Sequence, residues 1–99
     1  MIVYHGTTID CLESIEREGL RAGSFVSENR GLASQYSWLR ATTLGADACV
    51  LIELDVPSAA VVDAQSWWWA KGQLQLPVGC PASCIVSVDH SDPRQFSLD

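Results

Sequence analysis

Three separated pieces of this sequence carry residue types that suit the binding of a small planar ligand. An imidazole, an aromatic face and a carboxamide can each hold a ring or a hydroxyl, and a glycine leaves backbone groups open to close approach. The pieces are His5-Gly6-Thr7, Phe25 with Tyr36, and Gln73. Each alone is more often a structural feature than a site. Whether the three pieces can form one site depends on the secondary-structure elements that position them.

Hydrophobic spacing predicts those elements. The run Ile2 to His5, which ends in Gly6, is typical of a strand. Helical spacing follows, with Thr7 or Thr8 as the cap and Gly19 as the end. The later expected elements, in chain order, are a strand at 24–27, a helix capped by Glu28-Asn29 and ending near 41–44, a strand at 49–54, an edge strand or turn at 60–63, a short helix that contains 67–69 and ends at Gly72, and strands at 73–76 and 84–88.

The second predicted helix carries Leu32, Ala33, Tyr36 and Leu39 on the face that we expect to pack on the sheet. The strand at 49–54 is apolar almost throughout, so we expect it in the centre of the sheet. The order of elements neither alternates strictly nor forms a meander. We therefore predict one α+β domain over residues 1–99, with a split or strongly curved mixed β-sheet and two or three helices on its faces.

Composition excludes several functional classes. With 47% hydrophobic and 18% charged residues, the 99-residue chain has enough apolar material for one core. A net charge of -6 argues against direct binding to nucleic acid. No apolar stretch approaches the roughly 20 residues that span a bilayer, and the N-terminus does not resemble a signal peptide. We expect a cytoplasmic protein that does not bind membranes.

The cysteines do not have the spacing of a metal site. Cys11, Cys49, Cys80 and Cys84 include no paired Cys-x-x-Cys, so we expect no metal. Cys11 and Cys49 fall within apolar patterns and are predicted to be small core residues.

The pattern as a whole resembles the ADP-ribosyltransferase fold, in particular the diphtheria-toxin and poly(ADP-ribose) polymerase branch, with RNA 2′-phosphotransferases as more distant relatives. That family opens with a strand ending in His-Gly-Ser/Thr, and a helix that closes in Gly-Leu follows. Here His5-Gly6-Thr7 and Gly19-Leu20 match these motifs at the family's spacing.

The second part of the resemblance joins a strand to a helix. The family has a strand of the type Gly-Ile-Tyr-Phe-Ala, and a helical Tyr eleven residues after the strand Tyr. In this sequence Phe25 takes the strand position and Tyr36 follows it by eleven positions. The two agreeing spacings are more specific than either motif, and the resemblance covers most of the chain.

The resemblance implies an NAD site. The backbone of Gly6 would bind the carboxamide of nicotinamide, and Phe25 and Tyr36 would enclose its ring. His5 would hydrogen-bond a ribose hydroxyl, with Thr7 nearby. Either of two arginines would pair with the pyrophosphate: Arg21 or Arg30.

The sequence departs from the family at the late strand. The catalytic Glu of the active polymerases corresponds to Gln73, with Gln75 as the alternative. A Gln can hydrogen-bond a hydroxyl but supplies no negative charge, and losing one such group costs about 10²–10³ in rate. Two outcomes stay open: transfer of a single ADP-ribose to a protein partner, or a scaffold that acts by binding.

A second function class also stays open. A chain this short and acidic is typical of phage or mobile-element products such as anti-CRISPR proteins. It would then be a non-enzymatic inhibitor that binds a nucleic-acid-handling complex by charge mimicry. Trp67-Trp68-Trp69 cannot all share one helix face, so at least one indole is expected to be partly exposed. It would lie flat on the protein's own surface, or it would form a protein interface or an acceptor-docking wall beside the cleft. Both classes predict a protein partner, and neither predicts an oligomeric state.

Overall fold

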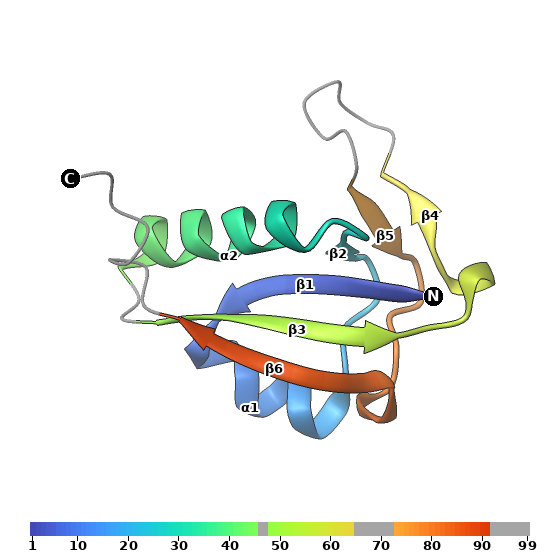
Figure 1. The fold of residues 1–99 in the computed structure, drawn as a ribbon. Helices are drawn as coiled ribbons and strands as arrows, with labels where there is room; N and C mark the ends of the chain where they lie inside the picture. The colour runs from blue at the N-terminus through green and yellow to red at the C-terminus, as the bar shows by residue number, and fades with distance from the viewer. Residues whose placement is uncertain (46–47, 65–72, 92–99) are drawn as a thin grey trace.

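In the computed structural model, which describes residues 1–45, 48–64 and 73–91, the strands form two three-stranded antiparallel sheets (Figure 1). The first sheet has the order β1 (Ile2–Thr8), β3 (Cys49–Asp55), β6 (Ile85–Ser91). The second has the order β2 (Ser24–Val26), β5 (Leu74–Leu76), β4 (Val62–Asp63). The helices are α1 (Ile9–Glu18) and α2 (Arg30–Leu44), with 3₁₀ helices at Ser58–Ala60 and Ala82–Cys84.

The α+β class with two helices is confirmed, and so is the central place of the strand at 49–54. The prediction of a mixed sheet is wrong for the described strands, because every pair of them is antiparallel. The expected short helix at Trp67-Trp68-Trp69 lies outside the described residues. No helix in the described part of the chain has the length and hydrophobicity needed to cross a membrane.

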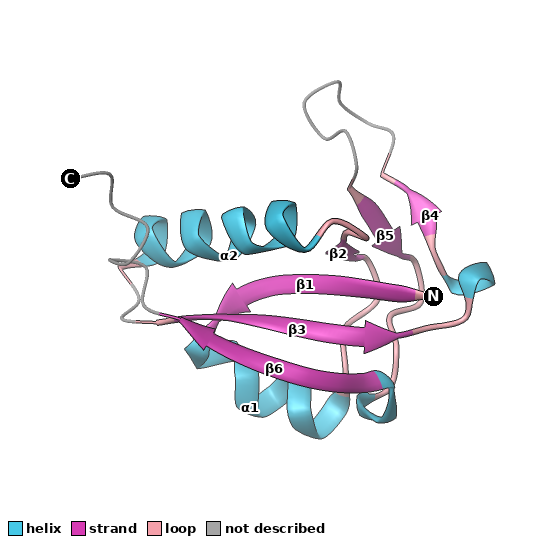
Figure 2. Cartoon of the chain, viewed as in Figure 1, coloured by secondary structure: helices cyan, strands magenta, loops and turns pink. Residues whose placement is uncertain are grey.

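The core joins the first sheet to α1 and to the second sheet, which contributes Val26 and Leu76. Val50, Ile52 and Leu54 of β3 are fully buried and pack with Leu12 of α1 in one apolar cluster. The helix α2 covers the opposite face of this sheet, against β1 and β3 (Figure 2). Both faces of β3 are therefore covered from Cys49 to Ile52, which explains why this part of the strand is apolar without alternation.

The face that α2 buries differs from the prediction. Leu39 was expected against the sheet but is 55% exposed, and Leu32 and Tyr36 are half-buried. The buried residues of α2 are small and recur every four positions: Ala33, Ser37 and Ala41. Small side chains let the helix axis come close to the sheet, so close approach rather than a stripe of large residues decided which face is buried.

Local capping chemistry sets the helix ends. Gly19 ends α1 with a φ of 83°, and its N–H donates to the carbonyl of Ile15. Asn29 caps α2 by accepting a hydrogen bond from the N–H of Leu32 at 3.0 Å. Thr8 precedes α1 as predicted but makes no side-chain capping bond, because it belongs to the longer β1, which pairs with β3 as far as Cys49.

Two backbone contacts tie distant segments together. Leu20 and Cys80 exchange hydrogen bonds of 2.9 and 3.1 Å. A Cβ on Gly19 would lie 2.0 Å from the carbonyl oxygen of Cys80, and one on Gly79 would lie 2.2 Å from that of Leu20. Only glycine fits at either position, and both glycines also have positive φ.

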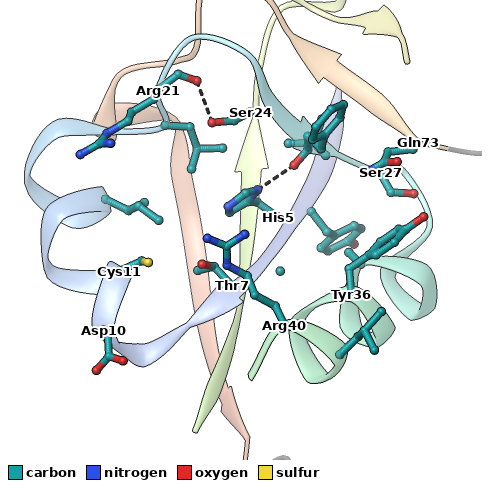
Figure 3. Close-up of a pocket in the computed structure, with 18 of the residues that line it drawn as sticks. His5, Thr7, Asp10, Cys11, Arg21, Ser24, Ser27, Tyr36, Arg40 and Gln73 are labelled. Atoms are coloured by element: carbon teal, nitrogen blue, oxygen red, sulfur yellow. Dashed lines mark hydrogen bonds between the residues drawn. The ribbon is translucent and has the colours of Figure 1, made fainter. Parts of the chain in front are cut away.

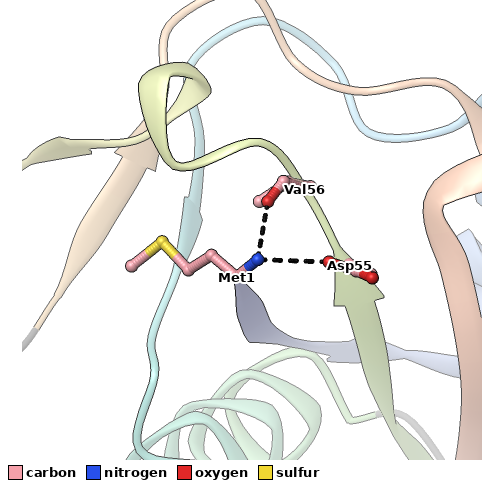
Figure 4. A network of polar contacts seen from close by, with 3 residues as sticks. All are labelled: Met1, Asp55 and Val56. Carbon is pink, nitrogen blue, oxygen red and sulfur yellow. Dashed lines mark hydrogen bonds and ion pairs between the residues drawn. The ribbon is translucent and has the colours of Figure 1, made fainter.

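Hydrogen bonds of the N-terminus form a second link between segments that are far apart in the sequence. The amino group of Met1 donates to Oδ1 of Asp55 at 3.2 Å and to the carbonyl of Val56 at 3.0 Å (Figure 4). These bonds hold the start of β1 against the end of β3.

Candidate functional site

A pocket of about 810 Å³ opens beside β1 and β2 (Figure 3). Its volume lies in the range of roughly 300–1,000 Å³ that is usual for small-molecule sites. Six of the residues that the sequence proposed for binding or catalysis line it: His5, Gly6, Thr7, Phe25, Tyr36 and Gln73. The structure therefore brings together side chains from β1, β2, α2 and the residue before β5.

The pocket begins where the pairing of β1 with β2 stops. Tyr4 and Ser27 exchange backbone hydrogen bonds of 2.7 and 2.9 Å, which joins the two sheets at one point. Continued antiparallel pairing would place Gly6 opposite Phe25. Instead, Nδ1 of His5 lies 2.7 Å from the carbonyl oxygen of Phe25. The imidazole therefore bonds to the carbonyl oxygen of Phe25, which the N–H of Gly6 would have used if the strand pairing had continued.

This arrangement leaves both backbone groups of Gly6 facing the opening. Along an antiparallel strand, the N–H and C=O of successive residues point alternately to the two sides. The N–H and C=O of Tyr4 bond to Ser27, on the side of the second sheet. The backbone groups of Ile9 point the other way, toward β3, since the Ile9 N–H donates to the carbonyl of Ala48. Gly6 shares the direction of Tyr4. No backbone partner is recorded for it among the described residues, so a donor and an acceptor stand together at the pocket.

The tautomer of His5 follows from its partner. A carbonyl oxygen only accepts, so Nδ1 carries the proton and Nε2 keeps its lone pair. Burial lowers the pKa of His5, and the charge of Arg40 lowers it further, against a smaller opposing effect of the bond to Phe25. The ring is therefore neutral at neutral pH, and Nε2 can accept a hydrogen bond from a ligand hydroxyl.

The remaining predicted groups supply flat surfaces and an amide. Phe25 is 48% exposed and Tyr36 is half-buried. Gln73 lines the pocket, whereas the amide of Gln75 donates to the carbonyl of Gly23 at 3.1 Å. Of the two glutamines considered, Gln73 is thus the one at the site.

The arginine assignments are corrected in part. Arg21 lines the pocket, but Arg30 does not. Arg30 forms an ion pair with Asp89, and its guanidinium lies 5.7 Å from the ring centre of Tyr4. Sequence reasoning missed Arg40 of α2, which also lines the pocket. No motif marks Arg40, because its direction depends on how α2 sits on the sheet.

Cys11 is a second residue that sequence reasoning placed wrongly. It was expected in the core, but it is half-buried and lines the pocket. The hydroxyl of Thr8 donates to its sulfur at 3.7 Å, and hydrogen bonds from Thr8 and Thr7 lower the pKa of the thiol. A thiol of lowered pKa that is open to solvent is more reactive than an ordinary buried one.

Comparison with protein-family models and with curated protein sequences finds no match for this chain. The site has to be interpreted from its own chemistry. It offers a backbone donor and acceptor, a neutral imidazole with a free lone pair, two aromatic faces, one amide and two guanidinium groups. This combination suits a ligand with a carboxamide on a flat ring, a hydroxyl and negative charge.

Proposed function

We propose that this protein binds NAD in the pocket, with the nicotinamide end at Gly6, and that it is a small ADP-ribosyltransferase-like protein. The observation that carries the proposal is the bond from His5 to the Phe25 carbonyl, which takes the place of strand pairing and leaves the backbone of Gly6 open. The resemblance of the sequence motifs to the transferase family supports the same ligand.

The chemistry of nicotinamide matches these groups one by one. Its carboxamide oxygen would accept from the N–H of Gly6, and its amino group would donate to the Gly6 carbonyl. The pyridine ring would stack against Phe25 and Tyr36, which contributes about 0.5–1.5 kcal/mol per pair. The adjoining ribose hydroxyl would donate to Nε2 of His5.

The proposed reaction is transfer of a single ADP-ribose to a carboxylate of a protein partner. The bond from ribose C1″ to the nicotinamide nitrogen breaks, and its electron pair leaves with neutral nicotinamide. A bond from the acceptor oxygen to C1″ forms, and no proton has to move. Gln73 would hold a ribose hydroxyl but cannot stabilise the positive charge at C1″, so the proposed turnover is slow.

Calorimetric titration with NAD tests the binding step, and mass spectrometry of incubated partner proteins tests transfer. His5→Ala removes both the acceptor and the bond to Phe25, so we expect at least about tenfold weaker NAD binding. His90→Ala is the matched control, because His90 is exposed on β6 and does not line the pocket. Absence of NAD binding to the unaltered protein, or equal loss in both variants, would refute the proposal.

Gln73→Glu tests the catalytic part separately. Restoring the carboxylate should raise the rate of nicotinamide release by about 10²–10³, because the new charge acts on the cation formed at C1″. Gln35→Glu makes the same charge change at an exposed position of α2 away from the pocket lining. A rate that is unchanged in Gln73→Glu, or raised equally in both variants, would argue against a transferase.

The alternative of an acidic inhibitor receives no specific support from the pocket. Charge mimicry would need acidic side chains gathered on a concave face. Among the residues that the structure describes, this hollow is lined instead by Arg21 and Arg40, with Asp10 as the one acidic residue.

A further inference from the structure

Two of the four cysteines lie next to each other outside the pocket. Cys80 and Cys84 are both partly exposed, and neither is among the residues that line the pocket. A hydrogen bond joins their two thiols. The proposed function gives these sulfur atoms no role, and a pair of adjacent thiols is the reactant from which a disulfide forms.

A tight turn brings the two thiols together. Pro81 precedes the 3₁₀ helix at Ala82–Cys84, and the N–H of Cys84 donates to the carbonyl of Pro81 at 3.1 Å. Because the chain folds back within these few residues, the side chain of Cys84 meets that of Cys80. The sulfur atoms are already in contact, so rotation of the side chains can bring them to the S–S distance of about 2 Å without a large movement of the backbone.

The backbone of Cys80 is fixed to the end of α1. It exchanges hydrogen bonds of 2.9 and 3.1 Å with Leu20. The next two residues also pack on α1, since a Cβ on Gly19 would lie 2.6 Å from the carbonyl carbon of Pro81 and 2.7 Å from the N of Ala82 (Figure 1). Gly19 and Leu20 both line the pocket. A bond formed at Cys80 therefore acts on a segment that is attached to one wall of the pocket.

The two thiols differ in their readiness to react. Burial raises the pKa of the Cys80 thiol, and the neighbouring Cys84 raises it further, against a contribution from the backbone of Leu20 that lowers it. Cys80 therefore keeps its proton at neutral pH, and a protonated thiol is a poor nucleophile. Oxidation of the pair should begin at Cys84, with Cys80 closing the disulfide.

We propose that Cys80 and Cys84 form a reversible redox site whose oxidant is hydrogen peroxide. The sulfur of Cys84 attacks one oxygen of the peroxide, the O–O bond breaks, and the leaving hydroxide takes the thiol proton and departs as water. Cys84 is then a sulfenic acid. The sulfur of Cys80 attacks the sulfur of Cys84, the S–O bond breaks, and the proton of Cys80 leaves with the hydroxide as a second water. In total the two thiols lose two electrons and two protons, and one peroxide is reduced to two waters.

The disulfide acts on the pocket wall through Leu20. A covalent bond across the turn removes open conformations of the segment from Cys80 to Cys84. The N–H of Leu20 donates to the carbonyl of Cys80, so it is exposed to solvent only when that segment opens. Oxidation should therefore slow the exchange of the Leu20 amide hydrogen with water. The redox site does not depend on whether the pocket binds NAD.

Treatment of the folded protein with hydrogen peroxide, followed by peptide mass spectrometry without reduction, tests the site. We expect a bridge between Cys80 and Cys84 that dithiothreitol removes. In Cys84→Ser, the loss of the free thiol at Cys80 should be at least about tenfold slower, because a lone thiol of raised pKa reacts slowly. Cys11→Ser is the matched control: it removes another partly exposed thiol, near the opposite end of α1 from Gly19, and should leave the rate of bridge formation within about twofold. Circular dichroism checks that each variant is folded.

Three results would overturn the redox site. They are a bridge from Cys80 or Cys84 to a different cysteine, separate sulfinic acids without a bridge, and loss of the Cys80 thiol as fast in Cys84→Ser as in the unaltered protein. Hydrogen exchange followed by NMR tests the link to the pocket wall. Exchange of the Leu20 amide slowed at least about threefold in the oxidised protein supports this link, and equal exchange in the two forms refutes the link while the redox site stands.

Discussion

Replacing Gly6 with alanine tests the packing that shapes the pocket. A Cβ at this position would lie 2.2 Å from the carbonyl oxygen of Ala33, and 2.8 and 2.9 Å from Cβ and N of Ser37. Ordinary contacts of a Cβ begin at 3.4 Å. Because two of the three obstructing atoms belong to the backbone of α2, no side-chain rotation relieves the clash, and the helix has to move away by about 1 Å or more.

The cost follows from overpacking. Forcing extra atoms into a packed interior typically costs about 1–3 kcal/mol, and a clash with backbone places Gly6→Ala in the upper half of that range. For a domain of this size, each kcal/mol lowers the melting temperature by about 4–8 °C. Thermal unfolding followed by circular dichroism should therefore show a loss of roughly 10–20 °C.

Gly31→Ala is the matched control, because the nearest atom to its added Cβ is Oδ1 of the Asn29 side chain at 3.3 Å. In a helix this change should alter stability by no more than about 1 kcal/mol. A melting temperature for Gly6→Ala within about 3 °C of the unaltered protein would show that α2 does not depend on the missing side chain, and the account of the buried face of α2 would be wrong.

Three further predictions concern titration, reactivity and capping. Burial lowers the pKa of His5 from 6.5, so the unfolded chain binds more protons than the folded one, and the free energy of unfolding should fall as the pH drops below about 6.5. Urea titrations at several pH values should show this loss of stability. The loss should be smaller in His5→Asn and unchanged in His90→Asn. Iodoacetamide at neutral pH should label Cys11 faster than Cys80, whose pKa is raised by burial, and equal labelling of the two peptides in mass spectrometry would contradict this. Asn29→Ala should cost about 1 kcal/mol in urea unfolding, and an unchanged midpoint would mean that the cap contributes nothing.

The parts of the fold that sequence could predict depend on local chemistry. Gly19 and Asn29 end and begin helices through their own backbone or side chain, so their neighbours in sequence suffice to recognise them. The strand at 49–54 is apolar enough to be central in any packing. The grouping of His5 with Phe25 required the family resemblance, since no local pattern relates residues twenty positions apart.

The parts that sequence could not predict depend on the approach of α2. Helical spacing alone ranks Leu39 above Ser37 as a core residue, but Gly6 leaves room for a close contact that only small side chains can make. The same rotation of the helix turns Arg40 toward the pocket. A further use of Gly6 also emerged only in the structure: its missing side chain accommodates α2, and its N–H and C=O face the pocket.

The exchange of bonds between Leu20 and Cys80, flanked by Gly19 and Gly79, bears on how the chain folds. A contact between segments so far apart can form only after a long loop has closed, which slows folding relative to a protein of local contacts. During synthesis, the loop after α1 has no partner until the segment around Cys80 has been added. The loop after α1 therefore lacks this anchor until most of the chain has been made.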